Sequence, residues 1–404
     1  MKRAISAARV VTCDPVLTTA DNPLGVLLDT AVIIEDDRIY AIVPLGALDV
    51  ALPHEAFGAL VMTPGLVDAH THAAWTGSRH DEYAIKMGGG DYRDIAAAGG
   101  GIASSQRAVA AASEDDLAIE LSARLQRMAS LGVTTCEVKS GYGLEPDHEL
   151  KQLRAITRVA THLDLPKIVP TLLALHALPK TASDRMAYVS AVANLVDQVA
   201  AAKLARFVDA YVDGNAFSVV EARPICEHAR AVGLGVRLHV GQFGDVGGAE
   251  LAAEVGARSA DHLEHVSDEA LAKMAAAHVY ATLLPTACFT LKQAPPPIEA
   301  MRRANIALVV ASDANPGTAP TESLPLAMAL AVRLYGLTCE EAILGATRHA
   351  AGSLDSDAGI LRVGAPADLV VWDLPHEKAI VQPWGVSKTR QVVRDGIAIF
   401  TATH

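Results

Sequence analysis

Residues 64–72 read PGLVDAHTH, a short apolar stretch that ends in two histidines separated by one residue. Side chains two residues apart on a β-strand face the same side, so His70 and His72 can bind one metal ion together. Two neighbouring histidines also arise by chance in a chain that contains 15 of them. The pair therefore indicates a metal site only if other parts of the chain supply further ligands.

Two later apolar stretches end in residue types that bind metals, GVRLH in His239 and ALVVASD in Asp313. Between them, His262 ends a third strand-like stretch and is predicted to orient or deprotonate a water molecule at the metal. Taken singly, each of these residues is explained almost as well as part of the core or as a helix cap. Three imidazoles and one carboxylate suit Zn²⁺ or Fe²⁺, and Mn²⁺ is also accepted. The pattern predicts one divalent metal ion held by His70, His72, His239 and Asp313.

The middle of the chain alternates short apolar strands with alanine-rich amphipathic helices. The strand-like segment 207–212, FVDAYV, for example, precedes a helical segment at 219–232. Repeated βα units with polar residues at several strand ends favour a closed barrel over an open sheet. We therefore predict a metal-dependent α/β domain, a (β/α)8 barrel, over residues 62–355.

Both ends of the chain have the pattern of short β-strands separated by turns. Near the start, segments 31–34 and 38–43 flank Asp-Asp, and near the end, segments 367–372 and 391–396 have the same character. A chain of 404 residues is long enough for a barrel and a small second domain. Residues 1–61 and 356–404 are predicted to combine into one β-sandwich domain.

Composition excludes several classes of partner. A net charge of -12 argues against nucleic acids and anionic membranes. No apolar run is long enough to span a bilayer, and the first residues lack the pattern of a signal peptide, so a cytoplasmic protein is expected. The five cysteines form no CxxC pair and predict neither a disulfide framework nor a cysteine zinc site.

The order of the metal-binding residues resembles the amidohydrolase superfamily, in which a strand-one HxH, a strand-five His and a strand-eight Asp hold the metal. More narrowly, the chain resembles the imidazolonepropionase family over nearly its full length. The resemblance rests on GSR at 77–79, YRDIAAAGGG at 92–101, EVKSGYGL at 137–144, HALP at 176–179 and DANPGT at 313–318. These segments separate the family from other amidohydrolases.

The resemblance implies hydrolysis of the lactam bond of 4-imidazolone-5-propanoate to N-formimidoyl-L-glutamate, a step of histidine degradation. Asp313 is implied to pass a proton to the leaving ring nitrogen with help from His262, and which of the two is the principal base stays open. His176 is implied to stabilise charge on the ring carbonyl. The resemblance also implies a homodimer. No lysine is singled out as a carboxylated bridge between two metals, so a mononuclear site is expected.

The substrate implied by the resemblance is a small molecule with a carboxylate arm. Arg79 can bind that carboxylate through two hydrogen bonds, although an arginine at such a position can also form a surface ion pair. Tyr142 can donate a hydrogen bond to a polar ring. The full set of implied substrate contacts is Arg79, Tyr92, Tyr142, His176, Gln242, Asn315, Gly317 and Thr318.

Several positions depart from the family pattern. The loop after His239 reads Val-Gly-Gln, whereas family members usually carry an acidic residue there. Asp213 stands where Glu is frequent, and segments 171–173 and 284–289 also differ. These changes leave an alternative open, a hydrolase of a related ring such as hydantoin- or thiohydantoin-5-propionate, including desulfhydrase chemistry at C2. Cys288 would line such a pocket or simply pack in the core.

Two other classes of function are weighed against hydrolysis of a cyclic amide. A metal-free binding protein is disfavoured because every predicted ligand is retained. Ring deamination in related barrels usually uses a carboxylic acid after the strand-five histidine, and Gly241-Gln242 offers none.

Overall fold

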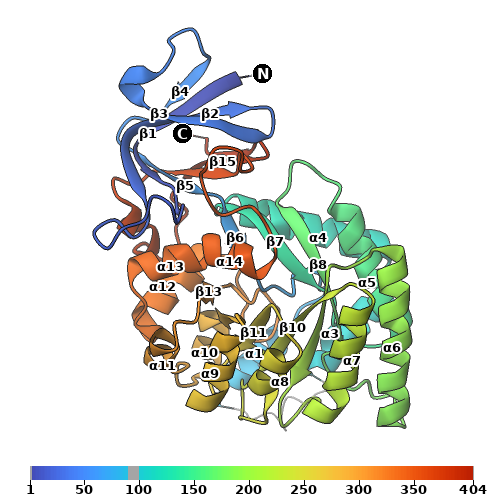
Figure 1. Ribbon diagram of the computed structural model, residues 1–404. Coiled ribbons are helices and arrows are strands. Elements are labelled where there is room, and N and C mark those ends of the chain that lie inside the picture. Colours follow the sequence, from blue (N-terminus) through green and yellow to red (C-terminus); the bar gives the residue numbers. More distant parts are fainter. Residues whose placement is uncertain (1, 90–99, 404) are drawn as a thin grey trace.

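The computed structural model describes residues 2–89 and 100–403, and these residues form two sheets with helices around one of them (Figure 1). One sheet is parallel and lies in the middle of the chain. The other joins strands from both chain ends and sits at the top of Figure 1. The expected fold, a (β/α)8 barrel with a small β domain built from both ends, is confirmed.

The parallel sheet runs in chain order from β6 to β13. It closes through the segments that follow its first and last strands, where Thr71 bridges to Ala314 and the Asp313 amide donates to the His70 carbonyl at 3.0 Å. This closure brings the predicted ligands of the first and last strands together. The strands are β6 (Leu66–Asp68), β7 (Val133–Lys139), β8 (Lys167–Leu175), β9 (Phe207–Val212), β10 (Gly235–Val240), β11 (Ser259–His262), β12 (Tyr280–Leu283) and β13 (Leu308–Val310).

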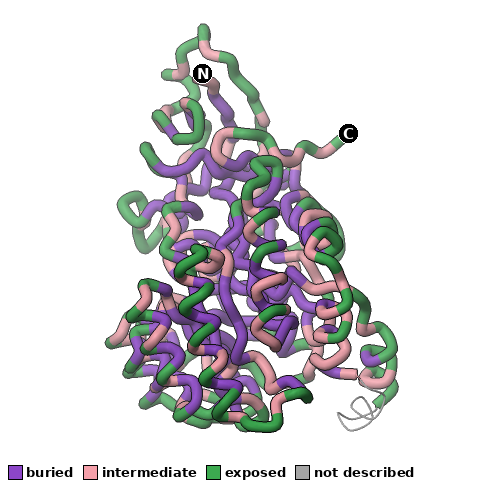
Figure 2. Tube along the Cα trace, turned by 90° about the vertical axis from the view of Figure 1, so that its right-hand side faces the viewer, coloured by how far each residue is buried: buried purple, intermediate pink, exposed green. Residues whose placement is uncertain are grey.

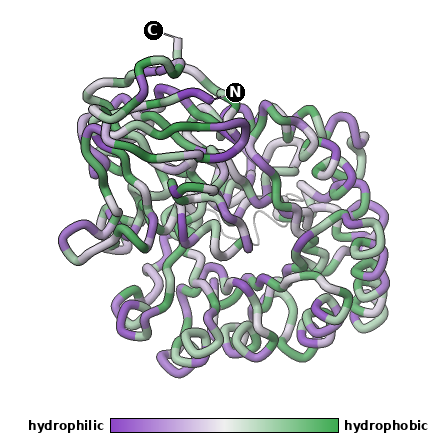
Figure 3. Tube along the Cα trace, turned by 45° about the horizontal axis from the view of Figure 1, so that its top comes forward, coloured by the Kyte–Doolittle hydropathy of each residue, from purple (hydrophilic) through white to green (hydrophobic). Residues whose placement is uncertain are grey.

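Helices cover the outside of the barrel, and the strands inside are almost entirely buried (Figure 2). Hydrophobic and hydrophilic stretches alternate along these helices, as amphipathic packing requires (Figure 3). None of the helices in the described ranges is long and apolar enough to cross a membrane. They are α1 (His80–Met87), α3 (Ile102–Ala111), α4 (Glu114–Ala129), α5 (Pro146–Val159), α6 (Arg185–Ala202), α7 (Val219–Ala231), α8 (Gly248–Glu254), α9 (Asp268–Ala276), α10 (Pro285–Leu291), α11 (Ile298–Arg303), α12 (Leu324–Tyr335), α13 (Cys339–Gly345) and α14 (Arg348–Ser353).

The small sheet has the strand order β16-β15-β14-β5-β1-β2-β3, with β4 paired to β1. Strand β5 pairs in parallel with β1 and antiparallel with β14, which ties the two chain ends together. The bounds 1–61 plus 356–404 for this domain stay a prediction. The strands are β1 (Lys2–Val11), β2 (Val26–Glu35), β3 (Arg38–Pro44), β4 (His54–Ala56), β5 (Val61–Pro64), β14 (Leu369–Trp372), β15 (Thr389–Arg394) and β16 (Ile397–Thr401).

The chain passes from the small sheet into the barrel at Gly65, between β5 and β6. A Cβ atom at Gly65 would lie 2.0 Å from the Thr134 hydroxyl oxygen, so only glycine fits beside β7. Trp372 of β14 is buried at the same junction and donates from its indole nitrogen to the Thr63 hydroxyl at 2.9 Å. All five cysteines are free in the structure.

Candidate metal centre and active site

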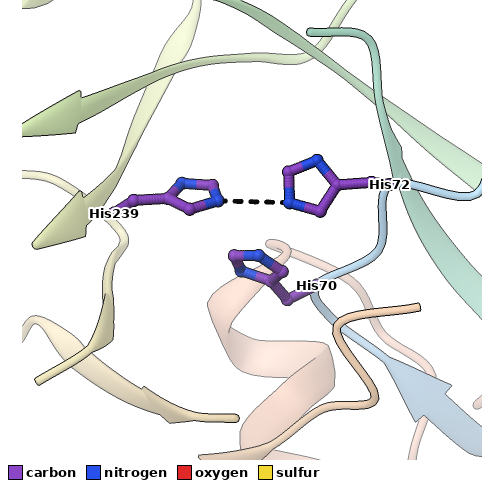
Figure 4. A group of neighbouring side chains, drawn as sticks. All are labelled: His70, His72 and His239. Atoms are coloured by element: carbon purple, nitrogen blue, oxygen red, sulfur yellow. Dashed lines mark hydrogen bonds between the residues drawn. The ribbon is translucent and has the colours of Figure 1, made fainter. Parts of the chain in front are cut away.

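Three histidines from two parts of the barrel converge on one point (Figure 4). His70 and His72 lie just beyond the end of β6, and His239 lies in β10. Their ligand atoms all lie within 4.8 Å of one another. Asp313, three residues beyond β13, places Oδ1 3.5 Å from Nε2 of both His70 and His72. The structure therefore brings together all four residues predicted to hold the metal.

The spacing of these atoms fits a tetrahedral metal ion. The Nε2 atoms of His72 and His239 are 3.3 Å apart. Ligand atoms about 2.0–2.1 Å from a tetrahedral Zn²⁺ ion are separated by about 3.3–3.4 Å. His70 Nε2 and Asp313 Oδ1 are buried without a hydrogen-bond partner, so a metal ion at this point would satisfy both atoms. The residues therefore fit a divalent cation.

Carboxylates behind two of the histidines set which ring nitrogen faces the metal position. Nδ1 of His70 lies 2.7 Å from Asp261, and Nδ1 of His239 lies 3.1 Å from Asp209. A carboxylate accepts a hydrogen bond from Nδ1–H, which leaves a lone pair on Nε2 for a metal. Burial lowers the pKa of each of the three histidines well below its usual value, so the rings are neutral at neutral pH.

A layer of buried charges lies behind these carboxylates and was not predicted from the sequence. The Lys139 ammonium lies 2.7 Å from both Glu137 and Asp209, and all three side chains are fully buried. Arg237 lies 3.4 Å from Glu137 and 3.5 Å from Asp261. Burial disfavours the charged lysine, but Asp209 and Glu137 raise the pKa of Lys139 above its usual value. Lys139 and Arg237 therefore pair with the carboxylates that orient His70 and His239.

A cavity of about 520 Å³ opens above the metal ligands. It is lined by the described residues that were predicted as catalytic or substrate-binding, namely Arg79, Tyr142, His176, Gln242, His262, Asp313, Asn315, Gly317 and Thr318. Tyr92 falls outside the described residues. Sequence reasoning missed Glu82, Lys86, Tyr211 and Asn215, which also line the cavity. Cys288, weighed as a pocket residue, is buried with Sγ 3.3 Å from the Gln293 carbonyl oxygen and is not among the lining residues.

One wall of the cavity is basic. Arg79 pairs with Glu82 at 2.6 Å, and its side chain is 17% exposed, so the pair faces the cavity instead of open solvent. A Cβ atom at position 317 would lie 2.2 Å from a terminal nitrogen of Arg79, so Gly317 leaves the space that this guanidinium occupies. Lys86 adds a second cation to the same cavity. This wall can bind the carboxylate of a small ligand.

Other residues of the cavity lining carry hydrogen-bonding groups suited to a polar ring. His176 lies with Nδ1 2.7 Å from the Gly141 carbonyl oxygen, so Nδ1–H donates there. Burial lowers the pKa of His176 to about 4, and in the neutral ring Nε2 is an acceptor. The oxyanion role expected of His176 therefore requires an additional proton on Nε2. Tyr211 donates to Gln242 Oε1 at 2.7 Å and fixes that amide at the cavity.

Asn315 shapes the loop beyond Asp313. Its Oδ1 accepts from the amides of Gly317 at 2.8 Å and Thr318 at 2.7 Å, while its Nδ2 donates to the Asp313 carbonyl at 2.7 Å. Asp313 itself has φ of 56°, in the left-handed region. The Asn315 amide is thus already engaged in holding Asp313, and its predicted contact with substrate stays a prediction.

The loop after β10 explains why no acidic residue stands at Gly241. Gly241 has φ of +65°, and a Cβ atom there would lie 2.4 Å from the carbonyl oxygen of His265. Its own carbonyl accepts from the His265 amide at 2.7 Å. The backbone of this turn therefore requires glycine, and no side chain at position 241 fits without moving the turn that follows β11.

Replacing Gly241 by alanine should destabilise the protein by about 1–3 kcal/mol, because both the left-handed backbone and the contact with His265 oppose a side chain. Denaturant unfolding of both proteins measures the difference. Gly46→Ala is the control, since nothing lies within 4 Å of a Cβ atom there. Equal stability of Gly241→Ala and the unmodified protein would contradict this account.

Comparison with known proteins agrees with the geometry. The model of the amidohydrolase family matches residues 61–398. The chain is 42% identical over 403 residues to an imidazolonepropionase of Chromobacterium violaceum, covering 97% of this chain and 96% of that protein. It is 44% identical over 330 residues to an imidazolonepropionase of Mesorhizobium japonicum, covering 80% of each.

The chain belongs to the amidohydrolase family. Its similarity to the two relatives places it with the imidazolonepropionases of that family.

The fold also matches an adenosine deaminase from Xanthomonas campestris with bound zinc, with a TM-score of 0.72, 18% identity and coverage of 98% of this chain and 92% of that one. The atrazine chlorohydrolase TrzN from Arthrobacter aurescens matches with a TM-score of 0.72, 15% identity and coverage of 98% and 95%. This amidohydrolase is therefore a metal-dependent hydrolase.

Proposed function

We propose that this amidohydrolase opens the ring of 4-imidazolone-5-propanoate to give N-formimidoyl-L-glutamate, a step of histidine degradation. The observation that carries the proposal is one cavity lined by His72, His239 and Asp313 of the metal centre and by Arg79. Such a cavity can hold a small ring at the metal while its carboxylate arm reaches a cation. The names of the relatives in Chromobacterium violaceum and Mesorhizobium japonicum support this substrate.

The metal position is assigned to His70, His72, His239 and Asp313, with Zn²⁺ or Fe²⁺ as the expected ion and Mn²⁺ as an acceptable replacement. When bound, a divalent ion supplies Lewis acidity and lowers the pKa of water at the site toward about 7. One ion per subunit is expected. A homodimer and a cytoplasmic location stay predictions from the sequence.

Two residues of the cavity are placed to transfer protons during the reaction. Water adds to the ring carbonyl carbon, the bond from that carbon to the ring nitrogen breaks, and the nitrogen takes up a proton. Asp313 and His262 are the groups placed to hold the proton lost by water and to deliver it to the nitrogen. Burial lowers the pKa of His262 to about 4, so its ring is neutral and able to accept a proton.

The remaining wall residues orient the ring. His176 Nε2 is placed to accept from a ring N–H, and Tyr142 lines the cavity with its ring centroid 5.6 Å from that of His176. Gln242, held by Tyr211, offers a further amide at the same wall. These contacts fix which face of the ring carbonyl meets the metal position.

Arg79→Met should lower kcat/KM for 4-imidazolone-5-propanoate roughly 10- to 100-fold, because hydrogen bonds to a charged group contribute about 1.5–3 kcal/mol. Steady-state kinetics measure the change. A matched imidazolone with a methyl group in place of the propionate arm should be hydrolysed equally by both proteins. Equal losses on both substrates would show that Arg79 acts on the fold of the cavity and not on the carboxylate.

Product analysis tests the proposed reaction. The metal-loaded protein is incubated with 4-imidazolone-5-propanoate, and mass spectrometry should detect N-formimidoyl-L-glutamate, the substrate plus one water. Release of sulfide from thiohydantoin-5-propionate, or ring opening of hydantoin-5-propionate without turnover of the imidazolone, would instead support the alternative substrates. The absence of any turnover would contradict the proposed function.

A further inference from the structure

His262 and Glu264 carry buried polar atoms that face each other and lack other partners. His262 ends β11 and lines the cavity, yet its Nδ1 is buried without a hydrogen-bond partner. Both carboxyl oxygens of Glu264 are also buried without a partner, and the side chain is 1% exposed. Nδ1 lies 3.7 Å from Glu264 Oε2, slightly too far for a hydrogen bond. A small rotation of either side chain would join the two groups.

The backbone between these residues is held in an unusual conformation. His262 and Leu263 have φ of 81° and 67°, so two consecutive residues with side chains lie in the left-handed region. The Leu263 amide donates to the Val240 carbonyl at 3.0 Å, and the His265 amide donates to Gly241 at 2.7 Å. Such strain persists only where the surroundings enforce it and is concentrated at functional sites. The turn carries Glu264 back beside His262.

No other acidic residue described near His262 is free to accept a hydrogen bond from its ring. Asp261, the preceding residue, accepts from His70 and is paired with Arg237. Within the described ranges, Glu264 is the one acid within 4.0 Å of a His262 ring nitrogen. A buried carboxyl group without a partner destabilises the folded protein. A hydrogen bond with His262 would remove this cost for Glu264.

We propose that Glu264 is a positioning residue for His262, accepting a hydrogen bond from Nδ1–H so that Nε2 keeps its lone pair toward the cavity. This inference rests on the proposed role of His262 in proton transfer. Burial raises the pKa of Glu264 to about 8, so the carboxyl group is mostly neutral at neutral pH and its carbonyl oxygen remains an acceptor. The pairing fixes the ring orientation and tautomer that a base requires.

Substitution at Glu264 tests this pairing. Glu264→Ala removes the acceptor and should lower kcat about 10- to 100-fold, with KM and metal content unchanged. Glu264→Gln retains a carbonyl oxygen of similar reach and should keep kcat within a few-fold of the unmodified enzyme. Glu250→Ala removes a carboxyl group of α8 that also has a buried oxygen without a partner but does not line the cavity, and it serves as the control with unchanged kcat expected. Unchanged kcat in Glu264→Ala, or an equal loss in Glu264→Gln, would overturn the proposal.

A direct measurement does not depend on activity. Nitrogen NMR of histidine-labelled, zinc-loaded protein, with His262→Gln for assignment, should show His262 protonated at Nδ1 and not at Nε2. An Nε2–H tautomer would overturn the proposal even if Glu264→Ala fails to fold. Turnover by the unmodified enzyme and its loss in His262→Ala are measured in the same assay, so a failure of the proposed function is distinguished from a failure of this pairing.

Discussion

His239→Ala is expected to abolish metal binding at the centre and to lower kcat/KM at least about 1,000-fold, since the metal supplies several kcal/mol of charge stabilisation. The substitution removes one of three imidazoles and leaves Asp209 with Lys139 but without its imidazole donor. Metal analysis of the purified protein and steady-state kinetics measure the two effects together.

A second histidine provides the control for this experiment. His228 lies on α7, is 36% exposed and pairs with Asp197 at the surface. His228→Ala should therefore keep full metal content and full activity. A His239→Ala protein that retains one equivalent of metal and normal turnover would contradict the assignment of the centre.

Lys139→Met should destabilise the folded protein by about 3–5 kcal/mol, because it leaves buried carboxylates without their cation. Glu137 and Asp209 both lie 2.7 Å from the lost ammonium. Metal affinity should fall about 10- to 100-fold as well, because Asp209 orients His239. Denaturant unfolding and metal titration measure the two changes.

Lys273 offers a matched surface lysine. It lies on α9, is 44% exposed and pairs with Glu269 one helical turn away. Lys273→Met should change stability by less than about 0.5 kcal/mol and leave metal affinity unaltered. If Lys139→Met behaves like Lys273→Met, the buried charges do not support the metal ligands.

The four predicted ligands could be found in the sequence because each ends an apolar stretch. A barrel brings the carboxyl ends of its strands to one face, so residue type and order are enough to predict that His70, His72, His239 and Asp313 meet. The strands themselves are shorter than expected, since β6 ends at Asp68 and β13 at Val310. The segments beyond these two strands carry His70, His72 and Asp313, whereas His239 lies within β10.

The charges behind the ligands could not be predicted in the same way. Lys139, Asp209 and Arg237 lie within buried strands, where a single charged residue in a sequence gives no indication of its partner. Lys139 of β7 meets Asp209 of β9, which is 70 residues away in the sequence, and Arg237 of β10 meets Asp261 of β11, so only the folded barrel brings these partners together. One local signal was available, because Arg237 lies two residues before His239 and therefore faces the same side of β10.

The backbone conformation of two loops also could not be predicted from the sequence. In the sequence, Gly241 is noticed only because the acidic residue usual in the family is missing. The structure shows that Gly241 forms a left-handed turn that contacts His265. Asn315 was predicted to contact substrate, yet its amide holds the loop that carries Asp313. Both roles depend on turn geometry, which residue identity alone does not specify.

The most direct test of the central claim is a comparison of kcat/KM for three rings that share a propionate arm. The metal-loaded enzyme is assayed with 4-imidazolone-5-propanoate, hydantoin-5-propionate and thiohydantoin-5-propionate under identical conditions. We predict that the imidazolone is hydrolysed with the highest kcat/KM and that His239→Ala abolishes its turnover. A clear preference for either of the other rings would contradict the proposed substrate.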